Sequence, residues 1–326
     1  MSERGLFQSD PKAGGIYVVG GTWNVLRRQS RGPSAVIGLT ALFVACSPAS
    51  EVALTTAPSG TSSSRTTYDV PRTTLAPSTT VPITTTSTPE LGTVRPDWIG
   101  TRLLELRPDG LGVPQPTPPE LVNRRFPSPD LLTPPAGEDF EWLIAPVPED
   151  VVARSSWREE CPVPVEDLTY LTLSFWGFDG LAHTGEMIVN SAFAEQVVEV
   201  FRRLHEIHFP IEEMRVQDQA EMDAHPTGDG NVTGSFECRP AVGRSGGWSM
   251  HAYGLAVDIN PFHNPYARGE VVAPELASAY IDRDNERPGM IFEGDTAVSS
   301  FDEMNWGWGG RWETAKDWMH FSSNGR

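Results

Sequence analysis

The chain has 326 residues, a formal charge of −18 and an isoelectric point near 4.8, values that allow one or two domains. Hydrophobic residues make up 39% of it, which excludes a wholly disordered chain. The negative charge argues against a nucleic-acid partner, because phosphate binding requires clustered Lys and Arg. Three cysteines are too few for a disulfide scaffold and too scattered for a Cys-based metal site. No apolar run reaches the ~18 residues of a membrane span.

The first segment, 1–46, has the pattern of an export signal. Arginines at positions 27, 28 and 31 precede a short apolar stretch that ends at Ala45 and Cys46, as in a secretory signal peptide. The end of this stretch resembles a bacterial lipobox, in which the cysteine is lipidated. The alternative is a short buried helix. We expect an exported, envelope-located protein that touches the membrane only through a lipid on Cys46.

Two Pro-rich segments follow the signal. From residue 47 onward, 27 of the first 43 residues are Ser, Thr or Pro, a composition that cannot offset its ordering entropy by apolar burial. We therefore interpret residues 47–94 as an extended linker. Residues 95–152 also carry large apolar side chains such as Trp98 and Phe126, which predicts an ordered arm with one or two short strands. The alternative is more linker. The folded domain then spans residues 153–326.

The periodicity of this domain predicts both helices and strands. Apolar residues from Phe193 to Ile207 recur at three- and four-residue spacing, which predicts a helix over 190–208 that Pro210 closes. A second helix is predicted over 273–284. Alternating or β-branched runs predict strands over 170–176, 211–217, 254–260 and 318–322. Because these elements do not alternate as regular βαβ units, we expect an α+β fold with an antiparallel sheet and flanking helices.

The residues that suggest chemistry lie in two short stretches. The first runs from Ser249 to Asn260 and places His251 in a loop and Asp258 on a strand, on the face turned away from the core. The second lies near the C-terminus and contains Asp317 and His320. Two imidazoles and one carboxylate are a common ligand set of catalytic zinc, which keeps one position open for water. Asp317 lies at a spacing that suits a general base. Taken singly, each residue is more often structural.

Together these stretches read SxHxxGxAxD followed by a distant [DE]xxH. This pattern resembles the signature of VanY-like zinc peptidases, which are bacterial D-alanyl-D-alanine carboxypeptidases and related L-alanyl-D-glutamate endopeptidases. The resemblance covers about Cys161–Phe321 and implies a Hedgehog/D-Ala-D-Ala peptidase-like zinc domain. It implies Zn²⁺ as the cofactor, bound by His251, Asp258 and His320. It also implies that Asp317 is the catalytic base.

The resemblance further implies substrate-binding residues just before the first motif. Arg239 is the candidate to grip a substrate carboxylate through two parallel hydrogen bonds, with Ser235 behind it. The alternative is an exposed arginine beside a disulfide. Cys161 and Cys238 are the only cysteines left after the signal, which favours a disulfide in an exported protein. Two free buried thiols are the alternative.

Several remaining residues have weaker signals. The stretch His183–Glu186 is interpreted as a turn typical of the family, with a structural role. Glycines and tryptophans alternate in Trp306–Trp312, which either packs the core or forms a loop close to a ligand. Four further histidines belong to no motif and are expected at the surface or beside the site: His205, His208, His225 and His263.

The resemblance implies that the protein hydrolyses peptidoglycan stem peptides, most simply as a D,D-carboxypeptidase acting as a monomer on the wall side of the membrane. An L-Ala-D-Glu endopeptidase of the same family is one alternative. A non-catalytic zinc-containing lipoprotein that binds the cell wall is another, and the presence of Asp317 favours the enzyme.

Overall fold

The computed structural model describes residues 90–241 and 246–326. The predicted signal, Cys46 and most of the predicted linker lie outside these residues. Its helices are α1 (Pro119–Val122), α2 (Glu149–Ala153), α3 (Ala194–Glu206), α4 (Gln219–Met222) and α5 (Thr296–Glu303). Its strands are β1 (Trp142–Pro146), β2 (Leu168–Trp176), β3 (Ala182–Asn190), β4 (Glu213–Met214), β5 (Val232–Thr233), β6 (Ala256–Asp258), β7 (Tyr266–Arg268), β8 (Val271–Ala273), β9 (Gly307–Trp308), β10 (Lys316–Asp317) and β11 (His320–Ser322). Across these two ranges, every helix is too short or too polar to cross a membrane.

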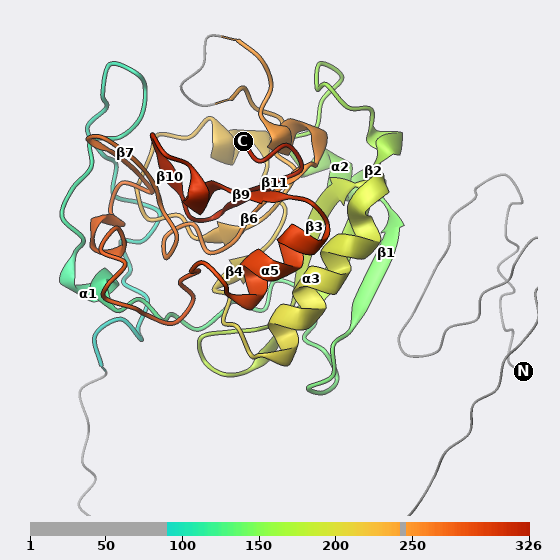
Figure 1. Ribbon diagram of the computed structural model, residues 1–326, viewed down its shortest axis with the longest axis horizontal. Coiled ribbons are helices and arrows are strands. Elements are labelled where there is room, and N and C mark those ends of the chain that lie inside the picture. Colours follow the sequence, from blue (N-terminus) through green and yellow to red (C-terminus); the bar gives the residue numbers. More distant parts are fainter. Residues whose placement is uncertain (1–89, 242–245) are drawn as a thin grey trace, which may run out of the picture. The chain divides into compact units, whose positions relative to one another are not determined.

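The strands form several small sheets in place of the single sheet that the sequence predicts. Three sheets are antiparallel, with strand orders β1-β2-β3, β10-β7-β8 and β6-β11-β9, and β4 pairs with β5 in parallel. Figure 1 shows the long β1-β2-β3 sheet beside α3, and the short strands β6, β9 and β11 together at the centre. Mixed helices and antiparallel sheets agree with the expected α+β class.

The main core lies between α3, α5 and the β1-β2-β3 sheet, and Figure 1 shows the two helices side by side. The apolar stripe of α3 includes Val197 and Phe201, both buried, as its spacing predicts. Burying such a side chain contributes roughly 1.5–3 kcal/mol. The helix is shorter than predicted, because a 3₁₀ turn over Ser191–Phe193 precedes it, and Asn190 accepts a hydrogen bond from the backbone of this turn. Its C-terminal end lies before His208, which has a positive φ of 54°.

The helix predicted over 273–284 is wrong. The segment starts as the end of β8 and continues through Pro274, whose ring removes a backbone donor. Its backbone groups bond to distant segments: Leu276 N–H donates to the carbonyl of Gly228, and the carbonyl of Glu275 accepts from a residue of the arm. Only a short 3₁₀ turn forms, over Ser278–Tyr280. These long-range bonds replace the local bonds of a helix.

Three predicted strands are shorter in the structure. Within 211–217 only β4 forms, and within 318–322 only β11, with β10 as a separate strand before it. The strand predicted over 254–260 is reduced to β6, because Asn260 has a φ of 45° and leaves the strand direction. The Asn260 side chain then bonds to the backbone of Glu212 and Pro210. It is buried in the structure and does not face a site.

The segment 90–152 is ordered and packs on the rest of the molecule. Its strand β1 extends the long sheet, with Trp142 opposite Leu173. Its side chains Leu121 and Phe126 belong to a second cluster of buried apolar residues, which also contains Phe262. The middle and the C-terminal part of this segment therefore contribute to the core of the domain.

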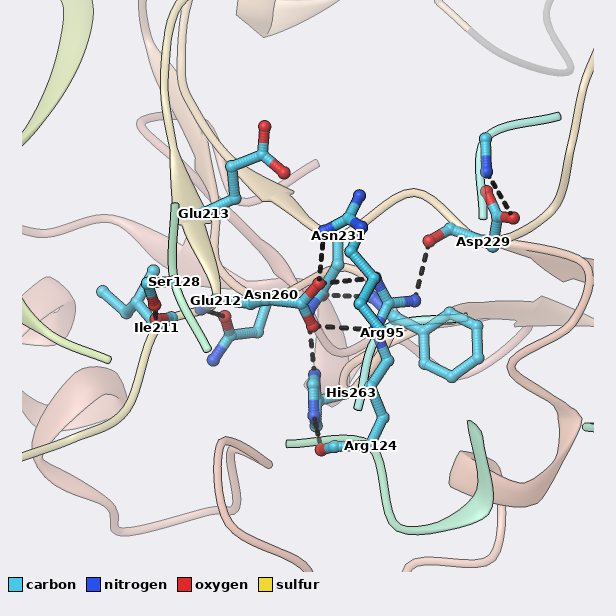
Figure 2. Close-up of polar contacts among 12 residues, drawn as sticks. Arg95, Arg124, Ser128, Ile211, Glu212, Glu213, Asp229, Asn231, Asn260 and His263 are labelled. Atoms are coloured by element: carbon cyan, nitrogen blue, oxygen red, sulfur yellow. Dashed lines mark hydrogen bonds and ion pairs between the residues drawn. The ribbon is translucent and has the colours of Figure 1, made fainter. Parts of the chain in front are cut away.

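A buried ionic network ties the same segment to β4 and β5 (Figure 2). Arg124 donates from Nε and Nη2 to the carboxylate of Glu212, at 2.7 Å each, and from Nη1 to the carbonyl of Asp229. Asn231 donates to the same carboxylate. Burial opposes ionisation of Glu212, but the charge and hydrogen bonds of Arg124 outweigh it and hold the pKa of Glu212 below its usual range.

Three expectations about polar residues need correction. His183–Glu186 is part of strand β3 and not a turn, and its Glu186 carboxylate accepts from Tyr170 at 2.6 Å and pairs with Arg154. His263 is fully buried and belongs to the network of Figure 2, where burial lowers its pKa to about 4. His205 is also buried and packs against Trp176. Neither histidine lies at the surface as the sequence suggested.

Candidate metal centre

The first motif folds into a tight turn followed by a strand. Ser249 begins a 3₁₀ turn over Met250–Tyr253, and its hydroxyl oxygen accepts from the backbone N–H of His251. Gly254 ends the turn with a φ of 65°, and a Cβ there would lie 2.6 Å from the backbone nitrogen of Asn190. Only glycine fits this position without displacing β3. The turn therefore fixes His251 just before β6.

The second motif joins the first through strand pairing. Strand β11 runs antiparallel to β6 with His320 opposite Asp258, and directly opposed residues project from the same face of a sheet. His320 Nδ1 lies 2.9 Å from Asp258 Oδ1, and His251 Nε2 lies 3.2 Å from Asp258 Oδ2. The two imidazole nitrogens are themselves 3.2 Å apart. Residues separated by 69 positions thus converge on one point.

The three side chains fit a zinc ion by chemistry and by spacing. Their ligand atoms all lie within 4.8 Å of one another, and a tetrahedral ion with bonds of ~2.0–2.1 Å would hold its ligands about 3.3 Å apart. His251 Nδ1 donates to the carbonyl of Ser235 at 2.6 Å, which leaves the Nε2 lone pair facing Asp258. Burial opposes the charge of Asp258, but His251 and His320 outweigh it and lower its pKa.

Asp317 lies beside this cluster on β10, where it pairs with Tyr266 of β7. Its Oδ1 is buried, and among the described residues it has no hydrogen-bond partner. Burial raises the pKa of Asp317 to about 7, although His320 lowers it. A Cβ at Gly309 would lie 2.6 Å from the carbonyl oxygen of Asp317, so this glycine permits the close approach of the preceding loop. An unpartnered carboxyl group with a pKa near neutrality is suited to accept a proton.

A cavity of about 920 Å³ opens at the cluster, and it is lined by His251, Asp258, Asp317 and His320. Arg239 also lines it, and its Nε donates to the carboxylate of Glu237 at 2.6 Å. The predicted substrate-binding arginine therefore lies in the same cavity as the metal ligands.

The structure gives Ser235 a place other than the predicted one. Its side chain is buried and does not line the cavity, while its carbonyl accepts from His251. Ser235 therefore orients a candidate metal ligand through its backbone, and its buried hydroxyl has no hydrogen-bond partner among the described residues. The predicted disulfide joins Cys161 to Cys238. It fixes the start of the segment that carries Arg239.

The tryptophan-rich loop divides between core and cavity. Trp306 and Trp308 are buried in the main core, which supports the packing interpretation. Trp312 lines the cavity, and its Nε1 donates to the carbonyl of Gly325. Its ring centroid lies 5.7 Å from that of His320. This residue therefore forms part of the wall beside the ligands.

Sequence reasoning missed other residues of the cavity. Tyr266 and Arg268 of β7 line it, as does Glu275. The only sequence signal for Tyr266 and Arg268 is alternation across the three residues of β7, a strand that the sequence analysis does not predict. Glu275 lies in the segment predicted as a helix, which does not form. Tyr266 and Arg268 reach the cavity through the pairing of β7 with β10, whereas Glu275 follows β8, which pairs with β7.

The comparisons with known proteins agree with the motifs. A search of curated proteins and a search of solved structures found no match, so the Hedgehog-like fold stays a prediction. A family model described as D-alanyl-D-alanine carboxypeptidase matches residues 243–323, which contain both motifs. This match over residues 243–323 supports the predicted resemblance to VanY-like peptidases.

Proposed function

We propose that this protein is a zinc-dependent peptidase that hydrolyses peptidoglycan stem peptides as a D,D-carboxypeptidase. The observation that carries the proposal is the unpartnered Asp317 carboxyl group in the same cavity as His251, Asp258 and His320. A metal cluster without such a group would suit a binding module. The pairing of a ligand set with a base favours an enzyme.

Each residue has a definable task in amide hydrolysis. His251, Asp258 and His320 would hold Zn²⁺, which supplies a Lewis acid and lowers the pKa of a bound water to ~7. Asp317 accepts a proton from the attacking water and delivers it to the nitrogen of the leaving amine. Arg239 binds the terminal carboxylate of the substrate through its guanidinium, which orients the last peptide bond.

The family match supports the proposed substrate class, and the predicted export signal supports the proposed compartment. A lipid on Cys46 and a long Ser/Thr/Pro-rich tether would hold the domain outside the membrane, within reach of the cell wall. A stem peptide ending in D-Ala-D-Ala has the free carboxylate that Arg239 can bind.

The experiment is digestion of purified peptidoglycan and of a synthetic stem pentapeptide, with products identified by mass. Release of D-alanine from the pentapeptide supports the proposal, and release of a fragment cut after L-alanine would instead indicate the endopeptidase. Asp317→Asn should keep the metal and lose about 10²–10⁴-fold in kcat with little change in KM. Full activity of this variant would refute the role of Asp317. Absence of any product with fully metallated wild type would favour the binding module.

A further inference from the structure

The cavity contains a positively charged group that the proposed mechanism does not use. Arg268 is an exposed residue on β7 and lines the cavity. Along this strand Tyr266 and Arg268 line the cavity and Ala267 does not, as the alternation of a strand requires. Arg268 therefore projects from the same face as the residue that pairs with Asp317.

The register gives the spacing between Arg268 and the reacting bond. Tyr266 lies directly opposite Asp317, and Arg268 is two residues further along the strand. With a rise of ~3.3 Å per residue, this displacement is roughly 7 Å. An extended peptide in the cavity has a similar rise, so Arg268 lies about two substrate residues from the position beside Asp317.

The cavity is mostly acidic, and Arg268 is one of its few positively charged groups. Five carboxylates line it: Glu237, Asp258, Glu275, Glu313 and Asp317. Three arginines also line it: Arg239 donates to Glu237, whereas the guanidinium groups of Arg268 and Arg326 have no hydrogen bond or ion pair with any described residue. An acidic cavity repels an acidic peptide unless its positive groups are available to the ligand. The guanidinium of Arg268 is exposed and, among the described residues, unpaired, so it is free to bind a carboxylate of the ligand.

We propose that Arg268 is a second carboxylate-binding residue, which selects stem peptides by a carboxylate on the acyl side of the bond that is cut. This inference rests on the proposed function. The leaving D-alanine offers only its terminal carboxylate, and Arg239 takes that group. A second guanidinium can therefore meet only carboxylates of the preceding residues. Stem peptides carry such groups on their acidic and diamino acid residues, as free acids or as amides.

The expected effect follows from the exposure of Arg268. A hydrogen bond to a charged group discriminates by about 10–100-fold when it is shielded from water. At the rim of a cavity solvent screens part of this effect. We therefore expect about tenfold preference for the carboxylate over the amide.

The test uses pentapeptides that end in D-Ala-D-Ala and differ only in whether the second- or third-residue carboxylate is free or amidated. Each is assayed for kcat/KM with the active protein, and for Kd with the Asp317→Asn variant, which reports binding without turnover. Arg268→Gln keeps the length and loses the charge. Arg202→Gln is the matched control, because Arg202 lies on α3 and pairs with Glu199.

The proposal predicts that, with Arg268 present, the peptide with one free carboxylate has about tenfold higher kcat/KM and about tenfold lower Kd than the amidated peptide. Arg202→Gln should leave this preference unchanged. Arg268→Gln should remove it, with the values for the amidated peptide unchanged. Equal values for free and amidated peptides with wild type would overturn the inference, and D-alanine release would show that the proposed function survives. The same binding preference without any hydrolysis would support the inference and refute the enzyme. A preference that persists in Arg268→Gln would assign it to another residue.

Discussion

The buried pair of Arg124 and Glu212 provides a sharp test of the fold, because its partners come from segments 88 residues apart. Their side chains are 1% and 0% exposed. In Arg124→Leu the Glu212 carboxylate stays buried and loses both hydrogen bonds from the guanidinium. It keeps the hydrogen bond from Asn231 and the longer ion pair with Arg95. Breaking a buried pair in this way costs about 3–5 kcal/mol.

This cost converts to a large change in thermal stability. For a domain of this size each kcal/mol shifts Tm by about 2–4 °C, so the variant should melt roughly 6–20 °C lower. Circular dichroism and calorimetry on the full chain measure this shift. Arg125→Leu is the matched control, because Arg125 is the neighbouring residue and pairs at the surface with Glu90. Its loss should cost less than about 1 kcal/mol.

The pH dependence of the same variant has a definite sign. In wild type the pKa of Glu212 lies below its usual value, so its stabilisation is present above an unfolded pKa near 4.5 and is lost as pH falls through the folded pKa. In Arg124→Leu only weaker contacts such as those of Asn231 and Arg95 oppose burial, which therefore favours the protonated form of Glu212 more than in wild type. The difference in Tm between the two proteins should therefore shrink from pH 7 towards pH ~4.

A double variant with Glu212→Leu should recover part of the loss, because neither charge is then buried alone. If Arg124→Leu melts within 2 °C of the Arg125→Leu control at pH 7, the segment 90–152 is not anchored as described. The reasoning about the arm would then fail, whatever the activity of the protein.

Three further predictions concern the site and the envelope location. His320→Ala should lose zinc by elemental analysis while its circular dichroism spectrum is retained, and full zinc in this variant would refute the ligand set. Gly254→Ala should destabilise the domain by at least 1–3 kcal/mol, since its positive φ and the 2.6 Å approach of a Cβ to Asn190 both oppose a side chain; an unchanged urea midpoint would contradict the close packing. Cys46→Ser should move the protein from the membrane fraction to the soluble fraction, and a wild-type protein that is already soluble would exclude the lipid anchor.

Local patterns in the sequence were sufficient to predict the helices and strands that depend mainly on their near neighbours. The apolar spacing of α3 and the alternating, aromatic-rich run of β2 predicted both elements, because their periodicity is set by the geometry of one helix or one strand. The two motifs predicted His251, Asp258 and His320 as one set, and the family match agrees with the motifs. The spacing within the first motif has a local cause, since Gly254 must close the turn that holds His251.

Only the tertiary structure decided the features that depend on distant partners. The segment around Glu275 has helical periodicity, yet its backbone bonds to the arm and to Gly228, so no helix forms. Ser235 lies near the first motif in sequence, but its carbonyl accepts from His251, and its buried side chain is not part of the cavity lining. Arg268 enters the cavity because β7 pairs with β10. Periodicity and motifs report what a residue does with its near neighbours, whereas these positions are set by pairings across the fold, which leave no local pattern.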